Sequence, residues 1–299
     1  MNQAKFIAKK FPSPLRYPGG KSSLKHFMGD LLLENGIKGI YCEAYAGGAG
    51  AALGLLTEGK VEQIVLNDAD PHIFAFWNSL LMNSERFINE LERTEITIEE
   101  WEKHKYIYDN PEEFSEFELG FSTFFLNRSN RGGILPKAGP TGGMSQKGNY
   151  KINARFRKEN LIPRIRKINE LKDRIMFYNL DALNFLSEVA TNLDINNTLI
   201  YLDPPYYEQG KNLYLNFYTH KDHSNLASFL ENLEHFKWIV SYDKVAEIEQ
   251  LYENYRKINF DINYSVQNAR LGSEIMYFSN SVIVPKQFKI NNKEYPIIL

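Results

Sequence analysis

The chain has 299 residues, of which 43% are hydrophobic and 14% aromatic, and its formal net charge is −2. This length and composition predict one large globular domain or a core domain with an insertion, and the near-neutral charge argues against a wholly basic nucleic-acid-binding protein. The longest apolar runs are only as long as strands, and residues 1–5 are polar with no apolar run behind them. We therefore expect no membrane span, no membrane partner and no secretory signal, and a cytoplasmic location.

Strands and helices are expected to alternate in the two end regions of the chain. Short apolar runs predict strands at residues 37–45, 61–67, 174–178, 198–202, 237–241 and 274–279. Helical periodicity lies between several of them, at residues 49–56, 71–82, 182–189 and 224–233. This alternation predicts an α/β fold with a parallel sheet and helices on both faces.

The first glycine-rich segment, Pro18-Gly19-Gly20-Lys21-Ser22, matches a phosphate-binding loop only superficially. The nucleoside-triphosphate motif requires glycine at position 15, where this chain has Leu15, and no strand is predicted before it. We therefore do not expect a GTPase or an ATPase.

Cys42 is the one cysteine of the chain and lies in a short apolar run. It can form neither an internal disulfide nor a Cys-rich zinc site, and we expect no metal in the protein. A buried core thiol is the favoured interpretation, so attack on a cytosine carbon through a thiolate is disfavoured.

The second glycine-rich segment, residues 43–50, lies between a predicted strand and a predicted helix, where glycines let a ligand approach a helix N-terminus. A dinucleotide fingerprint starting at Gly48 would need glycine at Leu53, so the match is imperfect. The next strand ends at Asn67 and Asp68, which places a carboxylate where a cofactor ribose would lie. Acidic residues before and after the loop fit an adenosine cofactor without phosphates, although a tight turn with a helix cap would also explain the glycines.

The centre of the chain, residues 86–160, differs from the two ends. Residues 84–118 contain 12 acidic and 4 basic residues, whereas residues 127–174 contain 13 Lys and Arg and 3 acidic residues. This asymmetry suggests one face for a polyanion and another for solvent, although charge runs more often form only a solvated face. After an acidic, helical part, residues 130–133 and 137–143 are too rich in glycine for a helix. We interpret the centre as an inserted small domain.

The predicted strand at 198–202 is followed directly by Asp203-Pro204-Pro205-Tyr206. This pattern predicts a buried parallel strand that ends abruptly, and ligands in open α/β sheets collect at such carboxyl ends. Because the prolines donate no N–H, the turn can present carbonyl oxygens. Asp203 and the Pro204 carbonyl could accept both hydrogens of an exocyclic amino group while Tyr206 stacks on the base, which would make an adenine nitrogen a usable nucleophile. A strand that ends in a polar turn explains the tetrapeptide alone equally well.

Together these motifs resemble the Dam-like D12 class of adenine-specific DNA methyltransferases, in which the cofactor loop precedes the target-recognition insert and the catalytic tetrapeptide follows it. The similar segments span nearly the whole chain in the family's order: residues 13–21, 43–50, 67–68, 179–182 and 203–206.

The resemblance implies a Rossmann-like, seven-stranded, S-adenosylmethionine-dependent methyltransferase sheet whose last strand is antiparallel in a terminal hairpin, for which residues 258–266 and 274–280 are candidates. It implies a catalytic domain of residues 1–77 and 161–299 and an inserted, mainly helical target-recognition domain of residues 78–160. It also implies that the target adenine is flipped out of double-stranded DNA. The branch that recognises GATC usually has an aromatic-Asn-Gly after its Asn-Arg pair; residues 127–133 of this chain differ, so GATC is not assigned as the target.

Residue roles follow from the matching segments and from the basic stretch. The expected catalytic residues are Asp203, Pro204, Pro205 and Tyr206, with Tyr207 as a second stacking candidate. The expected binding residues for the cofactor, S-adenosyl-L-methionine, are Tyr17, Lys21, Glu43, Tyr45, Gly47, Gly48, Gly50, Asp68, Asp181, Ala182 and Asp203. The expected DNA-binding residues are Arg128, Arg131, Lys137, Lys147, Lys151, Arg155 and Arg157, and Arg128 or Arg131 is the expected contact to guanine.

The expected reaction is direct in-line transfer of a methyl group to the N6 amino group of a flipped adenine, without a covalent enzyme intermediate. We expect the protein to act in a restriction–modification, phage or defence setting. A cognate restriction or defence component is the expected partner. Cytosine-N4 methylation uses the same geometry, but serine commonly replaces the first aspartate there. A similar tetrapeptide could also serve methylation of RNA or of a protein amide, and a catalytically silent DNA-binding partner of a restriction system could retain these motifs.

Overall fold

The computed structural model describes residues 13–16, 21–135, 137–207, 218–264, 270–290 and 293–298. Its α-helices are α2 (Lys25–Glu34), α3 (Gly50–Thr57), α4 (Pro71–Met82), α5 (Ser84–Arg93), α6 (Ile98–Asp109), α7 (Glu116–Ser129), α8 (Lys158–Asn169), α9 (Ala182–Glu188), α11 (His220–Asn232) and α12 (Ala246–Leu251). Short 3-10 helices are η1 (Lys21–Leu24), η2 (Pro111–Glu113), η3 (Arg131–Gly133), η4 (Ile152–Arg155), η5 (Lys172–Arg174) and η6 (Ala190–Asn192). The strands are β1 (Ile40–Glu43), β2 (Gln63–Asn67), β3 (Ile175–Tyr178), β4 (Thr198–Leu202), β5 (Lys237–Asp243), β6 (Arg256–Tyr264), β7 (Arg270–Phe278), β8 (Phe288–Ile290), β9 (Lys293–Tyr295) and β10 (Ile297–Ile298).

The central sheet has the strand order β10-β6-β7-β5-β4-β1-β2-β3. β1 to β5 run parallel to one another, whereas β7 is antiparallel to both of its neighbours, β5 and β6. The predicted seven-stranded sheet with its antiparallel terminal hairpin is therefore confirmed, and the two-residue β10 extends it at the β6 edge. β1 pairs with both β2 and β4, so the strand order reverses there, and the carboxyl ends of β1 and β4 flank the crevice where such sheets bind ligands.

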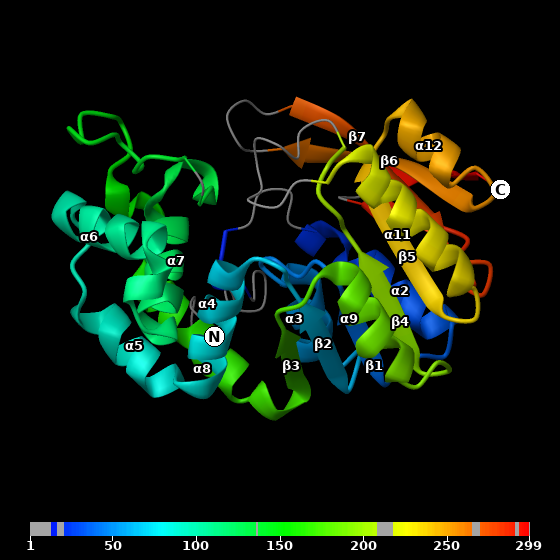
Figure 1. Ribbon diagram of the computed structural model, residues 1–299, viewed down its shortest axis with the longest axis horizontal. Coiled ribbons are helices and arrows are strands. Elements are labelled where there is room, and N and C mark those ends of the chain that lie inside the picture. Colours follow the sequence, from blue (N-terminus) through cyan, green and yellow to red (C-terminus); the bar gives the residue numbers. More distant parts are fainter. Residues whose placement is uncertain are drawn as a thin grey trace.

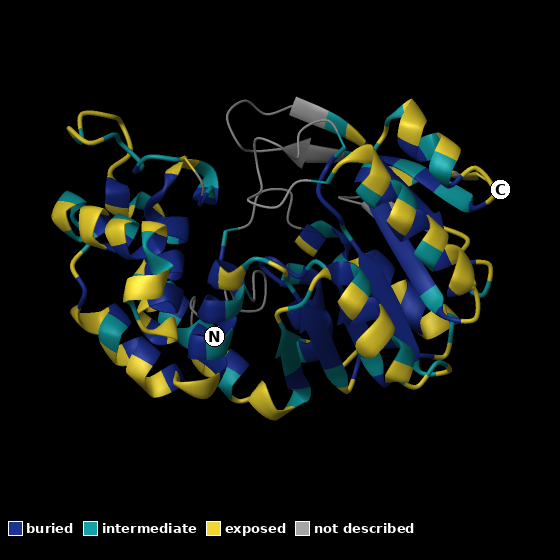
Figure 2. Cartoon of the chain, in the orientation of Figure 1, coloured by how far each residue is buried: buried dark blue, intermediate teal, exposed yellow. Residues whose placement is uncertain are grey.

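Helices cover both faces of the sheet, as a parallel sheet requires. Alternate residues of each strand enter two apolar cores: Tyr41 and Tyr201 face α2 and α3, whereas Cys42 and Ile200 face α9, α11 and α12. In Figure 2 the central strands are buried along their length, and exposed residues lie on the outer surfaces of the helices. Cys42 is fully buried, and burial raises the pKa of its thiol, so the prediction of a core cysteine is confirmed.

Between β2 and β3 the chain forms the helices α4 to α8, which lie beside the sheet (Figure 1). α7 packs closely on α4: a Cβ added to Gly120 would lie 2.3 Å from the backbone oxygen of Ala75. The ring of Phe76 stacks on that of Phe124, with centroids 5.9 Å apart. The predicted boundaries between residues 77 and 78 and between residues 160 and 161 fall inside α4 and α8, so both helices cross them. That this region is a separate domain remains a prediction.

The glycine-rich part of this region is not α-helical, as its composition predicts. It forms turns and one short 3-10 helix, η3. Gly132 has φ of 65°, a left-handed conformation that glycine adopts without steric cost. None of the described helices has the length and the apolar composition that a bilayer span needs.

Candidate functional site

The loops that follow β1, β2 and β3 meet at one buried side chain, Asn67, at the end of β2. Its Nδ2 donates hydrogen bonds to the carbonyl oxygens of Ala44 (3.1 Å) and Leu180 (3.0 Å), and its Oδ1 accepts one from the N–H of Leu180 (3.0 Å). Asn67 is fully buried. The protein's own polar groups therefore hold these three loops in register.

The loop after β1 is bound to Asp68 by the backbone. Gly47, at φ 46°, donates its N–H to Asp68 Oδ2 (2.7 Å), and Asp70 donates its N–H to Oδ1 (3.0 Å). The indole Nε1 of Trp77 in α4 donates to the carbonyl oxygen of Gly47 (2.9 Å). The predicted cofactor loop and the predicted ribose acceptor are thus in direct contact.

Two acidic residues at the carboxyl ends of β1 and β2 have raised pKa values. Burial, and then the charge of Asp70, raises the pKa of Asp68 to about 7, against the opposing effect of its two backbone hydrogen bonds. Burial and the nearby charge of Asp203 raise the pKa of Glu43 to about 8. Glu43 pairs with Tyr201 across β1 and β4, which brings it to the same side of the sheet as Asp203.

The carboxylate of Asp203, directly after β4, is held from two sides. Lys21 Nζ lies 2.9 Å from Oδ2 and 2.8 Å from Oδ1, and Ser241 Oγ donates to Oδ1 (2.9 Å). Because the one hydroxyl hydrogen of Ser241 goes to Asp203, the hydroxyl of Tyr201, 2.7 Å away, donates to Ser241. The register of β4 with β5 places Ser241 beside Asp203.

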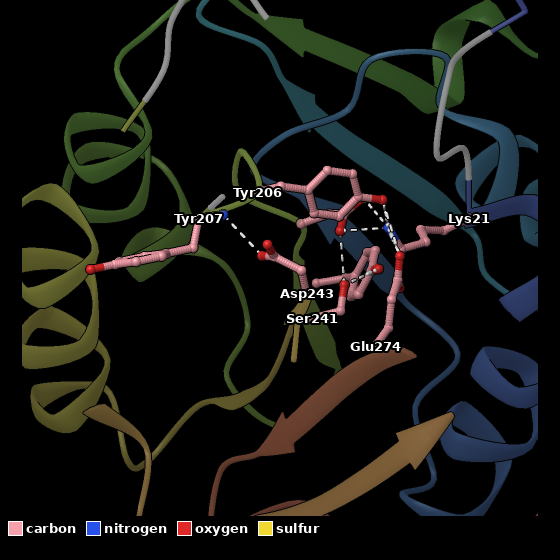
Figure 3. Close-up of polar contacts among 8 residues, drawn as sticks. Lys21, Tyr206, Tyr207, Ser241, Asp243 and Glu274 are labelled. Atoms are coloured by element: carbon pink, nitrogen blue, oxygen red, sulfur yellow. Dashed lines mark hydrogen bonds and ion pairs between the residues drawn. The ribbon is translucent and has the colours of Figure 1, made fainter. Parts of the chain in front are cut away.

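Lys21 joins Asp203 to a second carboxylate, that of the buried Glu274 in β7. Its Nζ lies 3.5 Å from Glu274 Oε1, which also accepts a hydrogen bond from the Tyr206 hydroxyl (3.0 Å). Lys21 is 6% exposed and Glu274 is 0% exposed. Burial alone would lower the pKa of Lys21, but the charges of Asp203 and Glu274 raise it well above its usual value. In Figure 3, Lys21, Tyr206 and Glu274 point toward one another.

Ser241 and Glu274 were not predicted as site residues. Each lies in a strand distant in sequence from the tetrapeptide, and only the pairing of β4 with β5 and of β5 with β7 brings them to Asp203. The available signal was Glu274 itself, because a carboxylate directly before the apolar run 275–278 is unusual in a buried strand.

The tyrosines around the site have defined polar partners. Tyr206 is buried, and its hydroxyl bonds to Glu274, whereas Tyr207 points away from this network in Figure 3 and donates its N–H to Asp243 Oδ1 (2.9 Å). The hydroxyl groups of Tyr45 and Tyr218 lie 2.8 Å apart. Stacking of Tyr206 and Tyr207 on a base stays a prediction.

The remaining predicted cofactor residues take local structural positions. Asp181 is exposed and caps α9 by accepting the N–H of Leu183 (2.9 Å), and the following Ala182 is buried. Gly48 is buried, and a Cβ on Gly50 would lie 3.2 Å from the Cβ of Ser22, so η1 packs against the loop after β1. Tyr17 lies outside the described residues.

Most predicted DNA-binding side chains are exposed. These are Arg131, Lys137, Lys147, Lys151, Arg155 and Arg157. Arg128 differs: it is half-buried, and its guanidinium donates to the backbone oxygens of Pro14 (3.5 Å) and Arg155. Burial, and then the charges of neighbouring arginines, lowers its pKa to about 9.

Within the part of the chain that the structure describes, no group of three or more His, Cys, Asp or Glu side chains is arranged to hold a metal ion. The expectation that the reaction needs no metal stays a prediction.

Comparison with known proteins identifies a family. Residues 17–266 match the model of the D12 class N6 adenine-specific DNA methyltransferases. No curated protein matches the sequence. Two structures of the rRNA methyltransferase aviRa from Streptomyces viridochromogenes resemble the chain, one at 11% identity and a TM-score of 0.37 over 89% of this chain and 88% of that chain. The other has 10% identity and a TM-score of 0.35 over 83% and 79%. Both TM-scores are too low to support an inference.

Proposed function

Because the chain belongs to the D12 class of N6 adenine-specific DNA methyltransferases, we propose that Asp203, Pro204, Pro205 and Tyr206 form its catalytic segment. The enzyme is a transferase that methylates the N6 amino group of adenine in DNA with S-adenosyl-L-methionine as the methyl donor. The observation that carries the assignment of the segment is the Asp203 carboxylate, which lies at the carboxyl end of β4 between Lys21 and Ser241.

Asp203 activates the amine by accepting one of its hydrogens, and the Pro204 carbonyl accepts the other. This pair of acceptors draws the nitrogen lone pair out of conjugation with the ring. A carboxylate has about four acceptor positions, so Asp203 can bind the amine while it remains bonded to Lys21 and Ser241. Those two bonds fix its orientation. Holding the amine and the methyl donor together in line can contribute about 7–11 kcal/mol to the reaction.

The family's cofactor supplies an electrophilic methyl group on a sulfonium cation. We propose that Lys21, Glu43, Tyr45, Gly47, Gly48, Gly50, Asp68, Asp181, Ala182 and Asp203 hold it, together with Tyr17. The donor set suits a cation, because the carboxylates of Asp203 and Glu274 outnumber the ammonium group of Lys21. Hydrogen bonds from ribose hydroxyls would favour the ionised form of Asp68, which burial disfavours.

We propose that residues 78–160 recognise the DNA and that the target adenine is flipped toward Asp203, since its amino group cannot be reached inside the duplex. Arg128, Arg131, Lys137, Lys147, Lys151, Arg155 and Arg157 are the proposed DNA contacts. Except for Arg128 their side chains are exposed, which supports contact with a polyanion.

We further propose that the enzyme acts in the cytoplasm together with a restriction or defence component. A methyltransferase with such a partner marks every copy of one short sequence, so this setting requires that the modified sites share one motif. Modification-aware sequencing of DNA from cells that express the protein should show methylated adenine in one short motif. Methylation scattered without a common motif would contradict this setting.

The reaction itself is tested by incubating the protein with duplex DNA and S-adenosyl-L-methionine that carries a labelled methyl group. Nucleoside chromatography should recover the label in N6-methyladenine. Label in N4-methylcytosine would replace adenine by cytosine as the target, and label transferred only to RNA would change the substrate class. Cofactor binding by calorimetry without any transfer would indicate a silent DNA-binding partner.

A further inference from the structure

Four arginines from separate segments lie together between the N-terminal segment and the helices α7 and α8. They are Arg16, Arg128, Arg155 and Arg164, from residues 13–16, α7, η4 and α8. Arg128 donates to the carbonyl oxygens of Pro14 and Arg155, Arg164 donates to that of Ser13 (2.9 Å), and Arg16 donates to that of Asn130 (3.3 Å). We call this group the arginine cluster.

The arginine cluster has no compensating negative charge. Among the described residues, no carboxylate lies within 4.0 Å of any of the four guanidinium groups, and their partners are neutral carbonyls. The four charges affect one another: after burial, the charges of Arg16, Arg164 and Arg155 lower the pKa of Arg128. Such a group of cations is stabilised by an anion from outside the protein.

The hydrogen-bonding capacity of the cluster is also incompletely used. The buried Nε atoms of Arg128 and Arg164 have no hydrogen-bond partner within the described parts of the chain. Arg155 is exposed, and Arg16 and Arg164 are partly exposed, so the cluster is open to solvent on one side. A guanidinium presents its N–H groups as a planar fork that matches the oxygens of a phosphate, and this geometry selects a phosphate over a simple halide.

The position of the cluster along the chain relates it to the catalytic segment. Arg16 precedes Lys21 by five residues, and five residues span at most about 18 Å. A DNA strand carries one phosphate per about 3.4 Å of helix axis, so Arg16 lies within roughly five base pairs' length of Lys21. A duplex with its target adenine at Asp203 can therefore place a backbone phosphate at the cluster.

We propose that Arg16, Arg128, Arg155 and Arg164 form one binding site for a backbone phosphodiester of the substrate DNA. This inference rests on the proposed recognition of DNA by the central region, and it adds Arg16 and Arg164 to the DNA contacts. It assigns Arg128 to a phosphate instead of guanine. A phosphate contact sets the position of the duplex and carries no sequence information of its own.

The test uses Arg155→Gln in the full-length protein, because the Arg155 side chain bonds to no described residue and its backbone acceptor for Arg128 is kept. Affinity for cognate and one-base-altered duplexes is measured at several salt concentrations. We expect an equal loss for both duplexes, on the order of tenfold. The log-affinity against log-salt slope should become smaller by at most roughly 0.9, the share of one phosphate, because three guanidinium groups remain around that phosphate. Arg93→Gln is the matched control, because Arg93 is exposed and pairs with Glu90; it should leave the slope unchanged.

A second variant tests whether the arginines share one phosphate. If they do, Arg155→Gln/Arg164→Gln should lower the slope by no more than roughly 0.9 in total, whereas separate phosphates would give about twice that change. Unchanged affinity and slope in the double variant, a loss of affinity for only one of the two duplexes, or a slope change of about twice 0.9 would each overturn the proposal. Wild-type protein that binds S-adenosyl-L-methionine but not DNA would overturn the proposed function instead. Thermal unfolding and cofactor titration confirm that each variant is folded.

Discussion

Lys21 is a buried cation and Arg128 a half-buried one, and the protein surrounds them with different charges. Lys21 lies between the carboxylates of Asp203 and Glu274, which raise its pKa well above the usual value. Arg128 lies among other arginines, and burial together with their charges lowers its pKa to about 9. The first charge is balanced inside the fold, whereas the second is left for a partner to balance. This difference separates a group that orients the proposed catalytic residue from groups that are proposed to bind a ligand.

Asp68 extends the comparison to negative charge. No cation lies within 4.0 Å of its carboxylate among the described residues, and burial raises its pKa to about 7. It therefore belongs with Arg128, as a group whose charged form is incompletely satisfied by the protein alone. Perturbed groups of this kind are concentrated at binding sites.

The largest expected effect comes from removing the carboxylate that Lys21 and Ser241 orient. Asp203→Ala should reduce methyl transfer to less than about a tenth of the wild-type rate, a loss of more than roughly 1.4 kcal/mol in the transition state. Cofactor affinity should fall less than the rate, because Asp203 is one of several proposed contacts to the cofactor but the proposed acceptor of the amine in the transition state. Single-turnover rates and cofactor titration measure the two quantities. If Asp203→Ala keeps more than about a tenth of the wild-type rate, Asp203 is not the catalytic carboxylate.

The balance at Lys21 can be broken directly by Lys21→Met. Removing one partner leaves the buried carboxylate of Glu274 and the partly buried carboxylate of Asp203 without their cation. Such a change costs about 3–5 kcal/mol of folding free energy. Urea unfolding measures it. The double variant Lys21→Met/Glu274→Gln removes one of the stranded charges and should recover part of the loss. If Lys21→Met has the same urea midpoint of unfolding as the wild type, the balance of charge between Lys21, Asp203 and Glu274 does not stabilise the fold.

Local sequence predicts the parts of the fold whose limits are marked by local chemistry. β4 and α4 have the predicted bounds, because the prolines after Asp203 end the strand and Asp70 followed by Pro71 begins the helix. α2 was not predicted, since no side chain caps its first turn. α7 was placed only within a broadly helical acidic part, because it buries residues on all sides and so loses the one-sided apolar period of a surface helix.

The same limit applies to the site. The loop after β1, the pair Asn67-Asp68 and the tetrapeptide are each a run of neighbouring residues, so each motif could be identified from the sequence. The contact of Asp203 with Ser241, and its link to Glu274 through Lys21, depend on strand pairing over 38 and 71 residues of sequence, which no local pattern encodes. The arginine cluster likewise depends on the packing of residues 13–16 against α7 and α8.

Asp68 gives the next effect, on cofactor binding. Asp68→Ala removes a charged acceptor proposed for the ribose hydroxyls and should weaken S-adenosyl-L-methionine binding by about 1.5–3 kcal/mol. The rate at saturating cofactor should fall much less, because such a contact contributes alike to ground and transition states. Isothermal titration measures the affinity. An unchanged dissociation constant would place the ribose elsewhere and remove Asp68 from the comparison.

The raised pKa of Asp68 also predicts how the free energy of unfolding depends on pH. A carboxyl whose pKa is raised by folding stabilises the fold while it is protonated, below its ordinary value near 3.8, and this stabilisation is lost as pH rises to about 7. Without cofactor, the wild-type protein should therefore lose more stability between pH 5 and pH 8 than Asp68→Asn, which cannot ionise there. If the free energy of unfolding depends on pH in the same way for the two proteins, folding does not destabilise the charged form of Asp68.

The smallest expected effect is on the stability of the free protein when one cluster arginine is removed. Because the four guanidinium groups repel one another and Arg155 is exposed, Arg155→Gln should leave the free energy of unfolding within about 0.5 kcal/mol of wild type, in contrast to Lys21→Met. Inorganic phosphate at constant ionic strength should then stabilise the wild type more than Arg155→Gln, because a ligand that binds only the folded state stabilises it by mass action. Thermal unfolding in phosphate and in chloride measures both effects. A loss from Arg155→Gln as large as that from Lys21→Met would mean that the cluster is balanced within the fold and that the contrast between the two regions does not hold.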